Sequence, residues 1–287
     1  MKLLSFTAAG RDSYGALTGP AGQEGVVDLG ARLGLRLPTL KALIAADAFA
    51  EAQTLVARGT VDHALADIRF RPVVPDPGKI VCIGLNYRDH VAEGGRDVTE
   101  KPVIFTRFAD SQMGHGEPMV RPRVSDKLDY EGELAIVIGR PGRHIAEADA
   151  LAHVAGYACY NDGSVRDWQR HTHQFTPGKN FASTGAFGPW LVTADEIADP
   201  TKLRLTTRLN GGVRQDTTTD MMIFSIPEQI AYISTFIPLA PGDVIVTGTP
   251  GGVGSRRNPP EYMKAGDVIE VEVSGVGLLR NPVVDEA

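Results

Sequence analysis

Three acidic residues, Glu131, Glu133 and Asp162, form the group of side chains in this sequence best suited to bind a divalent cation. Glu131 and Glu133 are two positions apart and are followed by the apolar run 134–138, which predicts a β-strand. Side chains two positions apart project from the same face of a strand. Adjacent carboxylates repel each other and are costly to desolvate, and a hard cation such as Mg²⁺, Mn²⁺ or Ca²⁺ removes both costs. Two hydrated residues at the start of a strand are the alternative interpretation of the pair alone.

A second chemically useful pair is His90 and Glu93, which follow a predicted strand at 79–85. A short helix would place residues three positions apart on one face. A carboxylate beside an imidazole fixes the tautomer and raises its basicity, which suits a general base near neutral pH. Gly94 and Gly95 come next and indicate the hinge of a closing lid. An incidental ion pair on an exposed helical turn is the alternative.

Cationic and polar residues suited to an anionic substrate lie further along the chain. Asp162, Arg166 and Gln169 would share a face of a helix that begins near Gly163. Lys179 lies in a turn rich in Gly and Pro, and arginine and lysine near a metal indicate a carboxylate substrate. The loop 246–254, which is rich in Gly and Thr, could offer backbone N–H groups to an anion. It lacks the ending of a phosphate-binding nucleotide loop, so a nucleotide site is not expected.

Two histidines, His171 and His173, offer a rival metal site. No third Cys or His lies at the spacing of a known zinc motif, so a role in the substrate pocket or in the structure is the preferred interpretation. A binding protein without activity is a further alternative. It is disfavoured because the three acids and the His90–Glu93 pair are all present.

The composition indicates a globular protein of one large domain or of one domain with a small appendage. The chain has 287 residues, a net charge of −6 and no long basic run, so a nucleic-acid partner is not expected. No apolar run approaches the roughly 18–20 residues of a membrane span, and the N-terminus is a poor signal peptide. We expect a cytoplasmic protein in which Cys82 and Cys159 are buried thiols, with a disulfide between them as the alternative.

The pattern of apolar residues predicts a small N-terminal α/β domain at 1–71 and a larger domain at 72–287. Short strands at 3–7, 14–18 and 25–28 precede a helical region, and a proline-rich connector at 70–78 marks the boundary. Further strands are predicted at 79–85, 103–107, 134–139, 155–160, 190–193, 203–209, 243–247 and 268–273. The clearest helix has Ser225 as its N-cap and Glu228 three positions later. Too few helices remain for βαβ alternation, so the predicted class is α+β and β-rich, with packed or rolled antiparallel strands.

These motifs together resemble the fumarylacetoacetate hydrolase family, in its bacterial branch of acylpyruvases and 2-hydroxyhepta-2,4-diene-1,7-dioate isomerases. The segments that carry the resemblance are Ile83-Gly84-Leu85-Asn86-Tyr87 with His90 and Glu93, Lys101-Pro102-Val103-Ile104-Phe105, Asp129-Tyr130-Glu131-Gly132-Glu133-Leu134, Asn161-Asp162, Lys179-Asn180-Phe181, Leu209-Asn210-Gly211 and Thr247-Gly248-Thr249-Pro250-Gly251-Gly252-Val253-Gly254. The resemblance implies a catalytic domain with a rolled, mixed β-sheet, a homodimer, and Mg²⁺ or Mn²⁺ as the cofactor.

The resemblance also implies roles for individual residues. The metal ligands would be Glu131, Glu133 and Asp162. The catalytic residues would be His90 and Glu93 on a lid helix, together with Lys179. The substrate contacts would be Arg166, Gln169 and Thr249. Apart from the resemblance, we also expect Tyr87 and His173 to contact the substrate. Residues 81–87 contain no acid, so the fourth metal carboxylate of the larger founding hydrolases is not expected.

The expected substrate is a small anionic 2-oxo or diketo acid. Its carboxylate and keto oxygens would chelate the metal, which would stabilise an enolate. The first expectation is hydrolysis of a C–C bond in a 2,4-diketo acid or acylpyruvate, which releases pyruvate and a second acid. A tautomerase (isomerase) of a hydroxymuconate-like dioate and a decarboxylase of an oxaloacetate-like acid are the alternatives. All three reactions share the enolate, so the metal ligands do not choose among them.

Overall fold

A mixed sheet of twelve strands forms the framework of the computed structural model, which describes residues 1–20 and 22–287. Neighbouring strands follow the order β4-β3-β2-β1-β14-β12-β11-β17-β6-β7, with β5 on β1 and β8 on β14. The strands of this sheet are β1 (Lys2–Ala8), β2 (Arg11–Thr18), β3 (Gly25–Asp28), β4 (His63–Ala64), β5 (Arg69–Phe70), β6 (Ile80–Gly84), β7 (Val103–Arg107), β8 (Gln112–Met113), β11 (Gly132–Ile138), β12 (Val154–Asp162), β14 (Gly185–Thr193) and β17 (Val244–Val246). Most pairs are antiparallel, whereas β17–β6 and β14–β8 are parallel.

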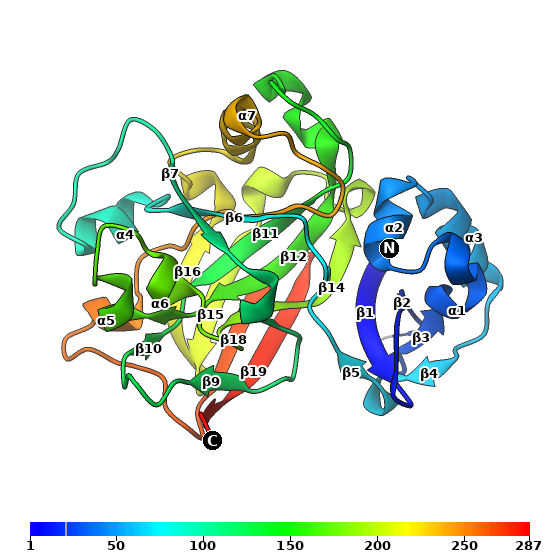
Figure 1. Cartoon of the computed structure of the whole chain (residues 1–287), viewed down its shortest axis with the longest axis horizontal. Helices are drawn as coiled ribbons and strands as arrows, with labels where there is room; N and C mark the ends of the chain where they lie inside the picture. The colour runs from blue at the N-terminus through cyan, green and yellow to red at the C-terminus, as the bar shows by residue number, and fades with distance from the viewer. Residues whose placement is uncertain (21) are drawn as a thin grey trace.

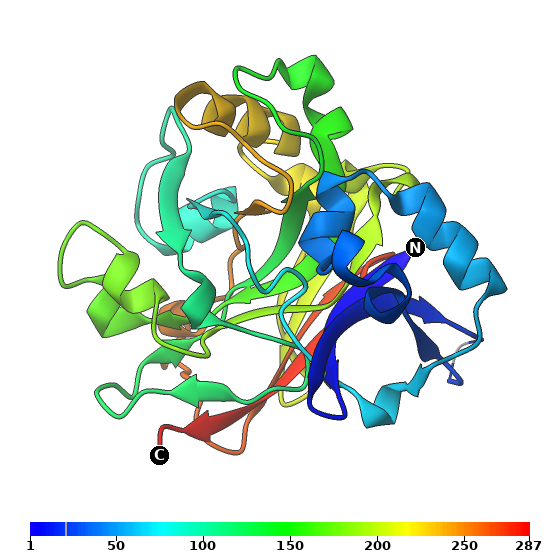
Figure 2. The same ribbon diagram turned by 45° about the vertical axis from the view of Figure 1, so that its right-hand side comes forward.

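A second sheet packs against the middle of the first (Figures 1 and 2). Its order is β16-β15-β18-β19-β9, and β10 and β13 form a separate pair. These strands are β9 (Met119–Arg121), β10 (Leu128–Asp129), β13 (Ser164–Val165), β15 (Arg204–Leu209), β16 (Gly212–Thr218), β18 (Val268–Val273) and β19 (Gly277–Asp285). The result is the predicted α+β, β-rich class.

The helices are short and lie outside the two sheets. They are α1 (Leu29–Leu33), α2 (Leu40–Ala45), α3 (Phe49–Arg58), α4 (Arg88–Glu93), α5 (Arg166–Gln169), α6 (Thr176–Lys179) and α7 (Ile226–Phe236). Figure 1 shows α1–α3 with the first strands in a unit on one side, and α4–α6 gathered on the opposite side. The predicted capping box at the start of α7 is confirmed, because Ser225 and Glu228 each accept a hydrogen bond from the other's backbone N–H.

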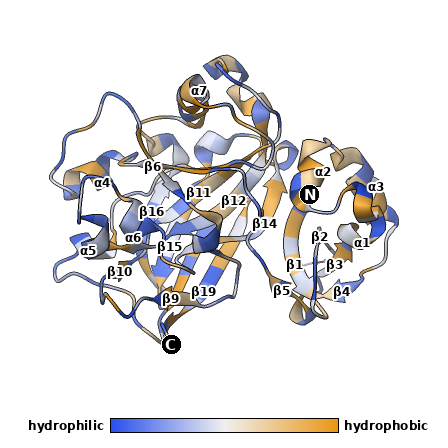
Figure 3. Ribbon diagram, in the orientation of Figure 1, coloured by the Kyte–Doolittle hydropathy of each residue, from blue (hydrophilic) through white to orange (hydrophobic). Residues whose placement is uncertain are grey.

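Strand β11 is buried on both faces, which explains its uninterrupted apolar run. Leu134 and Ile136 belong to the core that includes the second sheet. Ala135 and Val137 point to the opposite side and join a core with residues of the N-terminal unit such as Leu43. Figure 3 shows hydrophobic residues along the central strands β12 and β14 and mostly hydrophilic loops around them. A strand between two apolar layers gains no polar face, so alternation disappears from its sequence.

The N-terminal unit is joined to the rest of the sheet by main-chain pairing. Strand β1 pairs with β2 on one side and with β14 on the other, where Lys2 lies opposite Val192 and Leu3 opposite Leu191. The three predicted N-terminal strands are confirmed within one to three residues. The division of the chain at 71/72 remains a prediction, because the sheet runs across it.

Two predicted details of secondary structure are wrong. The helix expected near Gly163 begins only at Arg166, because Ser164 and Val165 pair with β10. Asp162 therefore lies at the end of β12 and shares no helix with Arg166. The second is the omission of several strands from the predicted set, of which β16 and β19 are the longest: β16 pairs with β15, and β19 pairs with β18 and β9.

Two further findings concern the cysteines and the helices. Cys82 and Cys159 are both free and buried, so the alternative of a disulfide between them is wrong. Within residues 1–20 and 22–287, every helix is too short or too polar to cross a lipid bilayer.

Shortening a side chain at the centre of β11 should destabilise the whole fold. Ile136 is fully buried between the sheets, so Ile136→Ala should lower the free energy of unfolding by about 2–5 kcal/mol and Ile136→Val by about 0.5–1.5 kcal/mol. Val213→Ala is the control, because Val213 is 53% exposed and should change stability by about 0.5 kcal/mol or less. Denaturant unfolding followed by circular dichroism measures all three, and equal effects at both positions would contradict the assigned core.

Candidate metal centre

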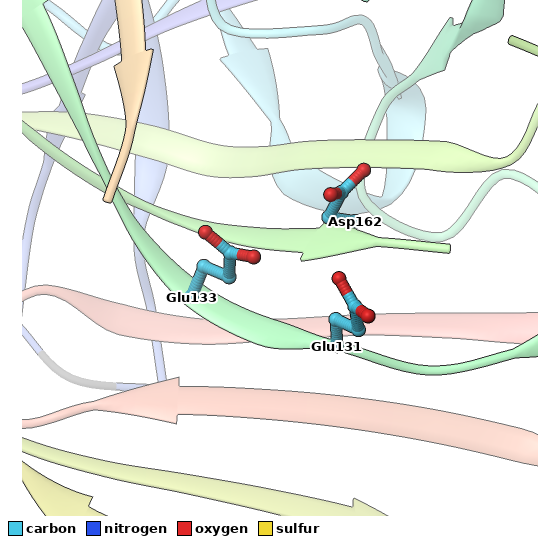
Figure 4. A group of neighbouring side chains, drawn as sticks. All are labelled: Glu131, Glu133 and Asp162. Carbon is cyan, nitrogen blue, oxygen red and sulfur yellow. The ribbon is translucent and has the colours of Figure 1, made fainter. Parts of the chain in front are cut away.

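The pairing of β11 with β12 brings the three predicted metal ligands together. Glu131 precedes β11, Glu133 lies within it, and Asp162 is the last residue of β12. The backbone N–H of Asp162 donates to the carbonyl of Glu131 at 2.8 Å, so these two residues are opposite each other. One carboxylate oxygen from each of the three residues lies within 4.8 Å of the others. Figure 4 shows the three side chains extending from two neighbouring strands into one space.

Two of the three carboxylates are compensated by buried cations. Lys179 Nζ lies 2.6 Å from Oε2 of Glu131 and 2.6 Å from Oδ2 of Asp162. Arg166 Nη1 lies 2.6 Å from Oε1 of Glu131, and Arg107 Nη1 lies 2.6 Å from Oδ1 of Asp162. Burial opposes ionisation of Glu131, but Lys179 and Arg166 together lower its pKa to about 2. Glu131 is therefore kept ionised, and Asp162 lies in contact with two buried cations.

Glu133 is the carboxylate that remains without a cation. Among the described residues it has no ion-pair partner, and the backbone N–H of Gly248 donates to its Oε2 at 2.5 Å. Burial, Asp162 and Glu131 raise its pKa well above the ordinary value. A buried carboxylate that is repelled by two others needs either a proton or a further positive charge. A divalent cation fits this oxygen-only set of ligands, and Mg²⁺ and Mn²⁺ prefer such ligands.

The predicted pair of His90 and Glu93 is present on α4. Nδ1 of His90 lies 2.7 Å from Oε1 of Glu93. Oε2 of Glu93 accepts a hydrogen bond of 2.8 Å from the backbone N–H of Gly252. The carboxylate therefore connects the imidazole to a fixed loop, and this arrangement holds one tautomer of His90 and leaves Nε2 available.

A small cavity joins these groups. It holds about 70 Å³ of free space, which is enough for several water-sized groups. Its charged and polar lining includes Glu131, Glu133, His90, Arg96, Arg166, Gln169, Arg170, Lys179, Thr249 and Arg256, and its apolar lining includes Ile83, Phe105 and Phe175. The lining thus has an ionic part that includes Glu131 and Glu133 and an apolar part.

Arg166 has a buried donor that no atom in the described part of the chain satisfies. Its Nε donates to Asp129 at 2.7 Å and its Nη1 donates to Gln169 Oε1 at 3.0 Å. Its Nη2 is buried and has no partner among the described residues. A buried N–H without a partner is costly, and a carboxylate bound in the cavity would satisfy it.

Of the predicted substrate contacts Thr249, Tyr87 and His173, only Thr249 lines the cavity. Thr249 lines the cavity, but its hydroxyl donates to the carbonyl of Gly132 and accepts from Gln215. Tyr87 is fully buried outside the cavity lining, and its hydroxyl has no partner among the described residues. His173 is exposed and also lies outside this lining. The structure therefore does not bring Tyr87 or His173 to the site, and their contact with substrate remains a prediction.

The Gly/Thr loop binds the protein's own carboxylates. The backbone N–H groups of Gly248, Gly252 and Gly254 donate to Glu133, Glu93 and Asp129, respectively. Gly248 and Gly252 have φ of +108° and +101°, a region that L side chains rarely adopt. The expectation that these N–H groups await an anionic ligand is therefore wrong at these three positions.

Two buried residues of the site were missed by sequence reasoning. Arg107 is wholly buried behind Asp162, and nothing local in its sequence indicated a buried cation. Asp129 accepts hydrogen bonds from Arg166 Nε, Gly254 N and Ser255 N at 2.7–2.9 Å. Its place two residues before Glu131 was a signal, since it extends the same acidic motif.

Comparison with known proteins agrees with this arrangement. Residues 79–284 match the family model described as the C-terminal domain of fumarylacetoacetate (FAA) hydrolase. The chain is 44% identical over 221 residues to human oxaloacetate tautomerase FAHD2A, mitochondrial, and the aligned region covers 76% of this chain and 70% of that protein. It is also 42% identical over 229 residues to oxaloacetate tautomerase YisK of Bacillus subtilis (strain 168), and this aligned region covers 78% of this chain and 76% of that protein.

Solved structures of similar proteins cover the whole chain. A putative HpcE protein from Mycobacterium smegmatis superposes with a TM-score of 0.88 at 35% identity, over 100% of both chains. A fumarylacetoacetate hydrolase from Exiguobacterium antarcticum gives a TM-score of 0.83 at 34% identity, again over 100% of both chains. The family match spans more than two thirds of the sequence and includes the acidic cluster, the His–Glu pair and the buried lysine. The chain therefore belongs to the fumarylacetoacetate hydrolase family.

Proposed function

We propose that this protein is a tautomerase that depends on Mg²⁺ or Mn²⁺ and interconverts the keto and enol forms of a small 2-oxo acid related to oxaloacetate. One observation carries the proposal: a small cavity is lined both by glutamates of an acidic cluster that has too few cations to balance it and by the histidine of a His–Glu pair. The names of the relatives that share 42–44% identity with this chain support the reaction type.

Each group of the site has a role in this reaction. Glu131, Glu133 and Asp162 would hold the divalent ion. That ion, when bound, supplies Lewis-acid stabilisation of negative charge on the 2-oxo oxygen. Nε2 of His90 removes a proton from the carbon beside the ketone, while Glu93 holds the opposite ring nitrogen, and the protonated imidazole then gives that proton to the 2-oxo oxygen to complete the enol. The unpartnered Nη2 of Arg166 binds the substrate carboxylate.

Lys179 serves mainly as a fixed positive charge. It is buried and bridges Glu131 and Asp162. Burial works against its charged form, but Asp162 and Glu131 raise its pKa above the ordinary value. It therefore stays protonated and stabilises negative charge that develops on the substrate oxygens. The apolar wall of Ile83, Phe105 and Phe175 limits access of water to the reacting carbon.

Hydrolysis of a C–C bond, the first expectation from the sequence, is the second candidate. The same His–Glu pair could activate water, and the similar structure from Exiguobacterium antarcticum bears the name of a hydrolase. The two reactions differ in one requirement: hydrolysis adds an oxygen atom of water to a product acid, and tautomerisation adds none.

An assay of both reactions tests the proposed function. With Mg²⁺, the protein should accelerate the loss of ultraviolet absorbance when enol oxaloacetate is added, and should speed exchange of the C3 protons for deuterium in heavy water. An acylpyruvate in ¹⁸O-labelled water should give neither pyruvate nor labelled acid. Labelled acid would establish the hydrolase instead, and release of carbon dioxide with pyruvate from oxaloacetate would establish the decarboxylase.

Glu133→Gln should separate metal binding from folding. The dissociation constant for Mn²⁺ should rise at least about tenfold, equivalent to about 1.4 kcal/mol, because a charged ligand is lost. The metal-free variant should be no less stable than the parent, since the amide relieves repulsion by Asp162 and Glu131. In the parent, Mn²⁺ should bind more tightly as the pH rises above 4.5, because binding displaces a proton held by the raised pKa of Glu133.

Calorimetric titration with Mn²⁺ and thermal unfolding measure these effects. The control is Asp195→Asn, an exposed acid outside the site. Unchanged Mn²⁺ affinity in Glu133→Gln would remove Glu133 from the metal site.

His90→Ala tests the identity of the base. The rate of tautomerisation should fall by about 10²–10⁴-fold, as for loss of a general base, while Mn²⁺ affinity stays the same. His153→Ala is the matched control, because His153 bonds to the carbonyl of Arg140 and lies outside the cavity. Full activity in His90→Ala, measured by deuterium exchange, would show that another group removes the proton.

Quaternary structure and location complete the proposal. We propose a homodimer, as the family resemblance implies. A cytoplasmic location is supported by the two buried free thiols, which suit a reducing compartment.

A further inference from the structure

Three arginines at the cavity have no role in the chemistry described above. Arg96, Arg170 and Arg256 all line the cavity that contains Glu131 and Glu133. Each is exposed, and within residues 1–20 and 22–287 none of their guanidinium groups has an ion-pair partner. Arg166 and Lys179, by contrast, are already engaged by Asp129, Glu131 and Asp162.

The backbone directs these arginines to the cavity from three separate segments. Arg170 is the C-cap of α5 and is four positions after Arg166, so the two side chains share one face of the helix. Arg256 ends a short 3-10 helix whose Gly254 and Ser255 N–H groups donate to Asp129. Asp129 also holds Arg166, so Arg256 has a fixed place near it.

Arg96 is fixed to the helix that carries the proposed base. Its backbone N–H donates to the carbonyl of Val91 at 3.2 Å, just after Gly95 turns the chain with φ of +62°. The backbone of Arg96 is therefore held against the helix that carries His90. Three like charges around one cavity repel each other, and an anion between them removes this cost.

We propose that Arg96, Arg170 and Arg256 bind the second carboxylate of a 2-oxo dicarboxylic acid. The first carboxylate and the 2-oxo group would face Arg166 and the acidic cluster, and the second would face the mouth of the cavity. This inference rests on the proposed function, because it assumes a 2-oxo acid in the cavity. It goes further by naming the residues that select a diacid over a monoacid.

The charge of the site supports a dianion. Glu131, Glu133, Asp162, Asp129 and Glu93 carry five negative charges, which Lys179, Arg166, Arg107 and a divalent ion would balance, before the arginines at the mouth are considered. A monoanionic acid would leave those three arginines without a partner. An acylpyruvate with an uncharged acyl chain would do the same, so the arginines favour a substrate with a charged distal end.

Binding of matched acids tests this inference without depending on turnover. The Mg²⁺-loaded protein is titrated calorimetrically with oxaloacetate and 2-oxobutanoate, and with 2-oxoglutarate and 2-oxopentanoate. Each pair has one chain length and differs in the distal carboxylate. In at least one pair the parent should bind the diacid about tenfold more tightly or better, as for a charge-assisted contact.

Variants then locate the selectivity. Arg170→Ala and Arg256→Ala should each weaken the diacid about tenfold and the double variant more, whereas the monoacid should change less than about twofold. Arg143→Ala is the control, because Arg143 is exposed, has no ion-pair partner in the described part of the chain and lies outside the cavity. Unchanged binding of the monoacid also shows that the variants are folded.

The outcomes separate this inference from the proposed function. Equal binding of diacid and monoacid by the parent, or equal loss of both in the variants, would overturn the distal-carboxylate site and leave tautomerisation standing. Selective binding of the diacid without tautomerisation would overturn the proposed function and leave the site standing. Binding of neither acid with Mg²⁺ present would overturn both.

Discussion

The mutual repulsion of three carboxylates buried within 4.8 Å of one another is the constraint on which the site depends. Each ion would lose several kcal/mol of hydration in such a place without compensation. Lys179, Arg166 and Arg107 supply the compensation for Glu131 and Asp162. Glu133 is left with a single backbone N–H, so the fold itself retains a deficit of positive charge where a metal is expected.

The surrounding elements are arranged to maintain this cluster. The loop after β17 reaches three carboxylates through its glycine N–H groups, and it thereby ties together Glu133, Glu93 and Asp129. A Cβ on Gly252 would lie 2.2 Å from the carbonyl oxygen of Arg214, so a larger residue cannot take its place without moving the loop. The loop therefore supports the acidic cluster through Glu133, the His–Glu pair through Glu93, and Arg166 through Asp129, and this arrangement preorganises their charges.

The same arrangement explains why related proteins bear the names of different enzymes. An acidic cluster, a His–Glu pair and a lysine can stabilise charge on a 2-oxo acid whichever reaction its carbon chain then undergoes. Selection among tautomerisation, decarboxylation and hydrolysis must come from groups farther from the metal ligands. In this protein the cavity lining beyond the acidic cluster includes the apolar Phe105 and Phe175 and the exposed Arg96, Arg170 and Arg256.

The sequence by itself determined the class of the fold, the helix cap at Ser225 and the identity of the acidic cluster and the His–Glu pair. Most of these features are local: a spacing of three in a helix brings His90 and Glu93 together, and a spacing of two in a strand does the same for Glu131 and Glu133, without help from distant residues. Family membership was accessible for the same reason, because it rested on short motifs in a fixed order. Asp162 joins the two glutamates only through the pairing of β11 with β12.

Only the tertiary structure decided which charges neutralise which. Arg107 and Asp162 are 55 positions apart, at the ends of β7 and β12, and the folded sheet places them in contact although three strands lie between β7 and β12. Tyr87 lies close in sequence to His90 but is buried outside the cavity, whereas Arg256 is distant in sequence and lines it. Contacts between segments depend on the register and packing of the sheets, and a single sequence carries no local signal of either.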